Sequence, residues 1–196
     1  MPKPKKDTGS STGAQSGRLG RSDWIEAAFR ALSVGGLGNL SVERLARELG
    51  ATKGSFYWHF TDRPALVEAV LEEWERRDTD HLIERASALD DPRARLQWLF
   101  HVVFAEDAVI GIDTALLADV ADPAVSAALE RVTSKRLRFI ERQFKLMGAS
   151  ASADRALLTY TAFLGLGQLR RATPSLTPTG RRSTTYVGHV TDWLLD

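Results

Sequence analysis

Beyond the first 21 residues, apolar side chains recur at three- and four-residue spacings, and helix-capping signals separate one run from the next. This spacing places apolar side chains on one face of an α-helix, whereas a half-buried strand requires strict alternation. Asp62 precedes a proline by two positions, and Asp91-Pro92 and Asp122-Pro123 each combine an N-cap with a proline at the first helical position. No strand or hairpin signal stands out, so we predict an all-α protein with about nine helices.

Composition excludes several classes of protein. The 196 residues contain no cysteine, which rules out a disulfide framework, thiolate metal ligands and a cysteine nucleophile. No apolar run is long enough to predict a membrane-spanning helix. The polar N-terminus has no apolar signal-peptide core, so we expect a cytoplasmic protein without a membrane partner.

The formal net charge of +1 conceals a gradient along the chain. Residues 1–63 hold ten Lys/Arg and six Asp/Glu, whereas residues 64–196 hold sixteen and nineteen. Residues 1–21 are basic, rich in Gly, Ser, Thr and Lys, and poor in large apolar side chains, so we predict a disordered basic tail. Such a tail is either simply solvated or an arm that contacts the phosphate backbone or minor groove of DNA.

Residues 22–60 predict three helices, of which the second and third are joined tightly at Gly50-Ala51-Thr52. This is the layout of a helix-turn-helix unit, in which the later helix enters the major groove. The third helix, predicted from Thr52 to about His59, carries polar donors and aromatic rings. Phe56 and Phe60 lie four residues apart on one face and suit the core. Tyr57 and His59 are donors suited to phosphate oxygens.

Residues 24–71 resemble the DNA-binding domain of the TetR family of bacterial transcriptional regulators. The residues that carry the resemblance are Trp24-Ile25, Ala28-Phe29, Leu40-Ser41-Val42, Leu45-Ala46, the run from Leu49 to Phe60, Asp62-Arg63 and Leu66. The departures are small, since Arg63 stands where lysine is more usual, Leu45 replaces a common isoleucine and Ser41 a common threonine. Beyond this segment, only length and helix count agree with the family.

The resemblance implies a dimeric, ligand-responsive repressor that inserts its third helix into each half of a palindromic double-stranded DNA operator. It divides the chain into the tail at 1–21, a DNA-binding domain at 22–62 and a ligand-binding and dimerisation domain at 63–196. The implied phosphate contacts are Ser41, Thr52, Tyr57, His59 and Arg63. Those implied nearest the bases are Lys53, Ser55 and Trp58, with Gly54 permitting close approach. Lys53 is equally suited to a base or a phosphate.

The resemblance also assigns the last two helices to a homodimer interface. The segment from Tyr160 to Gly167 is apolar or small nearly all round a helix, which predicts burial on more than one side. A central core helix in a monomer is the alternative, and Trp193 suits an interface or a core equally well. The candidate interface residues are Tyr160, Leu164, Gly165, Gly167, Tyr186, Val190 and Trp193.

Family analogy places an effector pocket among the middle helices. The candidate lining residues are Trp98, His101, Phe104, Leu117, Ile140 and Phe163. Each also suits an ordinary core, and His101 is the one titratable group among them. These positions hold no acidic ring or basic cluster, so we expect a hydrophobic or amphipathic small molecule.

Two other functions fit parts of the sequence. A DNA-binding dimer without an effector, controlled by a protein partner or by abundance, shares every feature of the N-terminal half. An all-helical enzyme is the remote alternative. The chain has only four histidines, and Asp78 and His81 have metal-friendly spacing but no second matching pair. We therefore predict no catalytic residue, no metal and no cofactor.

Overall fold

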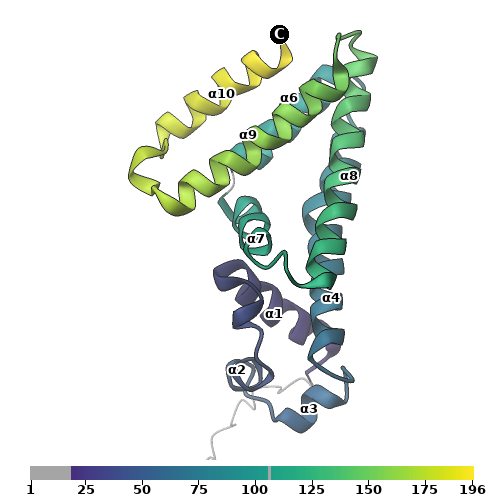
Figure 1. Ribbon diagram of the computed structural model, residues 1–196, viewed down its shortest axis with the longest axis vertical. Helices are drawn as coiled ribbons and strands as arrows, with labels where there is room; N and C mark the ends of the chain where they lie inside the picture. Colours follow the sequence, from purple (N-terminus) through teal and green to yellow (C-terminus); the bar gives the residue numbers. More distant parts are fainter. Residues whose placement is uncertain (1–18, 106) are drawn as a thin grey trace, which may run out of the picture.

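The structure, a computed structural model, describes residues 19–105 and 107–196, so most of the predicted basic tail lies outside the described residues. Within these ranges the chain is helical and contains no strand, which confirms the predicted fold class. Figure 1 shows α1, α2 and α3 at one end of the molecule and α9 and α10 at the other. The long helix α8 runs between the two ends beside α4, and α7 lies between α1 and α9.

The helices of the first end are α1 (Arg21–Gly35), the 3-10 turn η1 (Gly36–Asn39), α2 (Val42–Glu48) and α3 (Lys53–Tyr57). The middle of the chain forms α4 (Arg63–Glu75), the π-helical turn η2 (Arg76–Asp80), α5 (His81–Ser87), α6 (Pro92–Ala105) and α7 (Asp107–Ala118). The remainder forms α8 (Pro123–Leu146), α9 (Ser152–Ala172), the 3-10 turn η3 (Pro174–Leu176) and α10 (Arg181–Leu195). Because α4, η2 and α5 are continuous, the described ranges hold nine separate α-helices, as predicted.

Local capping explains where most helices begin. The Asp62 carboxylate accepts a hydrogen bond from the Ala65 N–H at 2.8 Å, and the Asp122 carboxylate accepts one from the Ala124 N–H at 2.9 Å. Each bond satisfies an otherwise unpaired donor of the first helical turn. One predicted end is wrong: α3 stops at Tyr57 rather than near His59. The chain turns there and stacks the ring of Phe60 on that of Phe56, with centroids 5.3 Å apart.

Two clusters of buried apolar side chains form the core. The first cluster is formed by the four helices α1, α2, α3 and α4 together with α7 and the N-terminal half of α8. It includes Trp24, Phe56 and Trp74. The second joins α5, α6, α9 and α10 with the C-terminal half of α8. Because α4 contributes Trp74 to the first cluster, α1, α2 and α3 fold against a helix that follows the predicted domain boundary at 62/63. Within the described residues, no helix is long and apolar enough to cross a membrane.

Candidate nucleic-acid interface and ligand cavities

The turn between α2 and α3 is built from local interactions. The Ser41 and Thr52 hydroxyls accept hydrogen bonds from the N–H groups of Arg44 and Ser55, at 3.3 and 3.2 Å, and so cap the two helices. Gly50 has a φ of 63°, a left-handed conformation that glycine adopts without strain. Gly50 and Thr52 therefore set the direction of α3 relative to α2, whereas Ser41 fixes the start of α2.

Helix α3 has one buried and one exposed face, and Phe56 is its buried residue. Phe60, predicted on the same helical face, lies beyond the end of α3 and reaches the core through the turn that follows. Phe56 is completely buried and packs edge-on against Trp24 at 5.3 Å. Tyr57 and Trp58 are 61% and 84% exposed, which is unusual for large aromatic side chains. Gly54 is also exposed, and a Cβ built there would meet only the Thr52 hydroxyl, at 3.6 Å. Packing within the chain therefore does not require a glycine at this position.

Arg63 and His59, two further residues predicted to contact phosphates, also form contacts within the chain. The Arg63 guanidinium donates through Nε to the Leu40 carbonyl at 2.7 Å and through Nη2 to the Leu37 carbonyl at 2.8 Å. Nε2 of His59 lies 3.0 Å from the Leu19 carbonyl oxygen. Arg63 therefore connects the start of α4 to the segment before α2, a structural role that the sequence analysis missed. A carbonyl partner leaves no signal in the amino-acid pattern.

Lys53 forms an ion pair with Glu43 of α2, with Nζ 2.5 Å from Oε1. The Ser41 hydroxyl donates to the other carboxylate oxygen of Glu43 at 3.0 Å. The hydrogen bond from Lys53 is the largest cause that lowers the pKa of Glu43, which falls to about 2. Glu43 therefore carries its negative charge at neutral pH, next to two residues that the resemblance assigns to DNA.

A small apolar cavity of about 50 Å³ lies between α5, α6, α8 and α9. Three of the predicted pocket residues line it, namely Phe104, Ile140 and Phe163. The polar side chains at its wall include Thr79, Arg136 and Tyr160, none of which the sequence analysis had assigned to a pocket. They come from three different helices, and their convergence depends on the tertiary fold.

A larger and more polar cavity, of about 580 Å³, lies between α6, α7, the end of α9 and the start of α10. His101 lines this cavity together with Arg171, Ser183 and Thr184. Trp98 and Leu117 line neither cavity: the Arg85 guanidinium covers the Trp98 ring at 5.0 Å, and Leu117 packs against the first core cluster. The six predicted pocket residues are thus divided among two cavities and two packed positions.

Arg136 joins three elements at the wall of the small cavity. Its guanidinium donates to the Thr79 hydroxyl at 2.9 Å, to the Asp78 carbonyl at 3.2 Å and to the Asp113 carboxylate at 2.5 Å. Asp113 is 1% exposed, and burial raises the pKa of its carboxyl although Arg136 opposes the shift. A buried pair of this kind is costly to break, because the remaining charge loses its partner.

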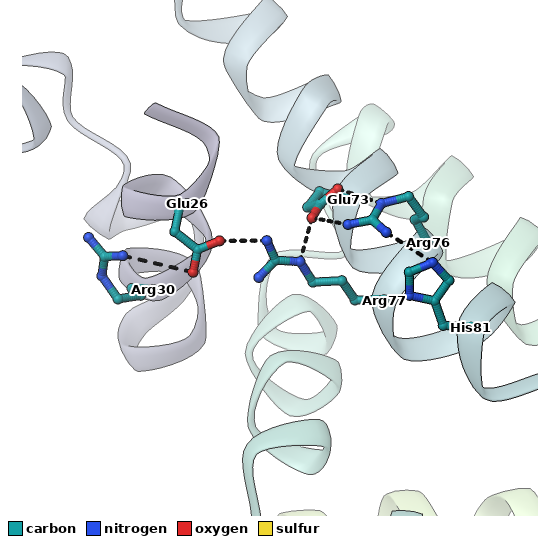
Figure 2. A network of polar contacts seen from close by, with 6 residues as sticks. All are labelled: Glu26, Arg30, Glu73, Arg76, Arg77 and His81. Atoms are coloured by element: carbon teal, nitrogen blue, oxygen red, sulfur yellow. Dashed lines mark hydrogen bonds and ion pairs between the residues drawn. The ribbon is translucent and has the colours of Figure 1, made fainter. Parts of the chain in front are cut away.

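A second polar cluster connects α1 to the turn η2. Figure 2 shows Glu26 of α1 facing Arg77 of η2, with Nη2 of Arg77 2.5 Å from Oε2 of Glu26. Glu73 accepts hydrogen bonds from both Arg76 and Arg77, and the Arg77 guanidinium lies 4.7 Å from the centroid of the Phe29 ring. The π-helical turn therefore contacts α1 through Arg77 and the cavity through Thr79, two residues later.

The predicted dimer residues have different surroundings in the single chain. Tyr160, Gly167 and Val190 are buried, Leu164 and Tyr186 are partly buried, and Gly165 and Trp193 are exposed. Next to the exposed positions, α9 presents three leucines to solvent, namely Leu157, Leu158 and Leu169. Among the described residues, no three His, Cys, Asp or Glu side chains are placed to share a metal ion.

The chain is similar in sequence to a known protein family and similar in fold to solved structures. Residues 25–70 match the model of the bacterial regulatory proteins of the tetR family. The HTH-type transcriptional regulator TtgR of Pseudomonas putida is 34% identical over 88 residues, which span 44% of this chain and only 41% of that protein.

Two solved structures with bound ligands share the fold over most of the chain. One is the transcriptional regulator FadR from Bacillus subtilis in complex with stearoyl-CoA (TM-score 0.69, 10% identity, covering 89% of this chain and 97% of that one). The other is a putative transcriptional regulator from Saccharomonospora viridis in complex with choline (TM-score 0.70, 18% identity, covering 89% and 94%).

Proposed function

We propose that this chain, which belongs to the TetR family of bacterial regulatory proteins, is a transcriptional repressor that binds a palindromic DNA operator as a homodimer. A small hydrophobic or amphipathic ligand binds in the C-terminal part and releases the protein from DNA. The observation that carries the proposal is the exposed side of α3, where Lys53 and Tyr57, and Trp58 directly after the helix, are exposed while Phe56 fixes the other face in the core.

The charge and shape of α3 support insertion into a major groove. The helix lies at one extremity of the molecule, clear of the second core cluster (Figure 1). Tyr57 offers a hydroxyl to a phosphate, Lys53 a cation to a phosphate or a guanine, and Gly54 a place where the DNA backbone can come close. Arg63 stays in the proposed set as a residue that positions α2 relative to α4.

The outer faces of α9 and α10 support a homodimer. Leu158 and Leu169 of α9 and Trp193 of α10 are each more than half exposed, although monomeric proteins rarely gather large apolar side chains at the surface. Gly165 has no neighbouring atom within 4 Å of a Cβ built on it, so a helix from a second copy could approach closely there. A second copy of this chain would cover these residues.

The apolar cavity supports a ligand with an apolar body and a polar end. Leu99, Phe100 and Phe163 supply apolar walls, whereas Arg136 and Tyr160 supply donors at one side. Because the cavity measures about 50 Å³ and ligand pockets measure several hundred, a ligand has to separate the helices that line it. The ligands of the solved neighbours, stearoyl-CoA and choline, differ so much that the fold alone does not define the effector class.

A movement of the cavity walls would be transmitted to α1 through η2. Arg136 holds Thr79 of this turn, and Arg77 of the same turn holds Glu26 of α1. A ligand that displaced Arg136 from Thr79 would shift η2 and change the position of α1 relative to the long helix. The released state is then a population in which the two α3 helices of the dimer no longer match successive major grooves.

The proposal is tested by footprinting the full chain on the DNA upstream of its own gene, followed by sedimentation of the protein–DNA complex. We expect a protected palindrome and two chains per palindrome. A protein that sediments as a monomer on DNA, or that protects no palindrome there or elsewhere in the genome, overturns the proposal.

A second candidate function is favoured by the small volume of the apolar cavity. An apolar cavity of only about 50 Å³ suits a DNA-binding dimer that a protein partner controls without any small-molecule effector. Thermal unfolding of the chain with a panel of amphipathic compounds separates the two functions. A compound that raises the melting temperature and releases the footprint supports the effector, whereas binding to DNA that no compound alters supports the protein partner.

A further inference from the structure

Glu43 is the one described acidic side chain that the structure pairs with a residue of α3. Its carboxylate lies between Lys53, whose Nζ is 2.5 Å from Oε1, and Ser41, whose hydroxyl donates to Oε2 at 3.0 Å. The side chains of Glu43 and Lys53 are both more than half exposed, so the pair lies at the surface that α3 would present to DNA.

The other glutamate of α2 has a different partner. Glu48 accepts a hydrogen bond from Arg30 of α1 at 2.9 Å, and its side chain is 42% exposed, against 55% for Glu43. The helix therefore carries two exposed glutamates of equal charge, one paired with the DNA-reading helix and one paired away from it. Glu48 provides a matched control for any effect of Glu43.

A carboxylate beside Lys53 opposes contacts with the phosphate backbone. A lysine that neutralises a phosphate releases a counterion and binds any sequence, whereas a lysine that reaches O6 and N7 of guanine binds only some sequences. Glu43 offers Lys53 a competing partner in place of a phosphate. An exposed ion pair contributes little free energy, so a well-placed guanine can replace the carboxylate.

We propose that Glu43 is a specificity-determining residue. Its ion pair with Lys53 competes with the phosphates of random DNA, and a base of the operator replaces Glu43 as the partner of Lys53. Glu43 then lowers the affinity for random DNA more than the affinity for the operator. This inference rests on the proposed DNA-binding function and names a residue that acts through Lys53.

The test compares wild type, Glu43→Gln and Glu48→Gln by fluorescence anisotropy on two duplexes, one of random sequence and one carrying the footprinted palindrome. The glutamine carbonyl oxygen can accept from the Ser41 hydroxyl as the carboxylate does, and the cap of α2 is retained because it is the bond from the Arg44 N–H to Ser41. We expect Glu43→Gln to bind the random duplex roughly two- to fivefold tighter, the range that loss of an exposed ion pair allows. The slope of log affinity against log salt becomes steeper by about 0.9, the value for one additional phosphate contact.

The ratio of operator to random affinity falls in Glu43→Gln, and Glu48→Gln behaves as wild type. A Lys53→Gln background separates action through Lys53 from a general effect of charge. We expect Glu43→Gln to change nothing there, and an effect that persists overturns the inference. If the wild type binds the palindrome and the two variants change the affinities equally, the inference about Glu43 is wrong while the proposed function stands. A wild type that binds neither duplex overturns the proposed function itself.

Discussion

The backbone N–H of Leu37 donates a hydrogen bond of 2.6 Å to the Asp119 carboxylate, which lies 82 residues later in the chain. The bond joins η1, just before α2, to the segment that follows α7. Gly36 lies beside it with a φ of 66°, and a Cβ built there would be 2.3 Å from the same carboxylate oxygen. The position of η1, and of α2 after it, therefore depends on a residue from the other half of the chain.

Replacement of Asp119 by alanine leaves the Leu37 N–H without its partner in a partly buried site. We expect the free energy of unfolding to fall by about 1–3 kcal/mol, as for other buried donors that lose an acceptor. Urea denaturation checks this value. Glu130→Ala, at an exposed position of α8, should change stability by less than about 0.5 kcal/mol. Equal stability of the two variants would show that Asp119 does not anchor η1.

Tyr57→Phe and Arg63→Ala should have different consequences although the resemblance assigns both residues to phosphates. Tyr57 is exposed, so the loss of its hydroxyl should weaken DNA binding and flatten its salt dependence without changing the melting temperature. Arg63→Ala removes two donors to backbone carbonyls and should lower the free energy of unfolding by about 1–2 kcal/mol as well. Anisotropy and thermal unfolding measured on the same samples distinguish the two roles.

If Arg63→Ala weakened DNA binding at unchanged stability, the contacts with Leu37 and Leu40 would contribute nothing and a direct phosphate role would remain. If Tyr57→Phe left both measurements unchanged, Tyr57 would not contact a phosphate. Both variants are expected to weaken DNA binding, but only Arg63→Ala is expected to lower stability.

The cluster of Figure 2 predicts acid sensitivity of the link between α1 and η2. The Arg77 hydrogen bond lowers the pKa of Glu26, and that from Arg76 lowers the pKa of Glu73. A carboxyl whose folded pKa lies below its unfolded value of about 4.3 adds stability above that value and loses it as the pH falls through the folded pKa.

Glu26→Gln should therefore be less stable than wild type at neutral pH, by less than about 1 kcal/mol because the pair is partly solvated. The difference should shrink as the pH falls below about 4, where wild-type Glu26 takes up its proton. Urea unfolding across this pH range measures the difference, with Glu130→Gln as the exposed comparison. A difference that stays constant with pH would contradict the ion pair between Glu26 and Arg77.

A charge at the outer face of α9 should separate the proposed homodimer. Leu158→Glu places a carboxylate where a second copy would bury an apolar side chain, and we expect a monomer by analytical ultracentrifugation and weaker operator binding. Leu146→Glu is the matched control, since Leu146 at the end of α8 is 56% exposed and Leu158 is 59% exposed. Dissociation by both variants or by neither would contradict an interface at α9.

The helices and the orientation of α3 followed from the sequence, because caps and helical faces depend on residues within one turn of each other. Ser41, Thr52 and Asp62 cap the helices that begin after them, and Phe56 forms the buried face of α3. The resemblance added the family and a set of DNA-facing residues to this local information.

Tertiary structure decided the contacts between residues that lie far apart in the chain. Nothing near Arg63 in the sequence indicates that its guanidinium bonds two carbonyls more than twenty residues earlier, and nothing near Arg136 indicates Thr79 or Asp113. Periodicity identified Phe104, Ile140 and Phe163 as apolar, whereas only the packing of α5, α6, α8 and α9 decided that they share one cavity. The reason is physical: a helix forms from local spacing, but the partner of a buried polar group depends on which helices pack together.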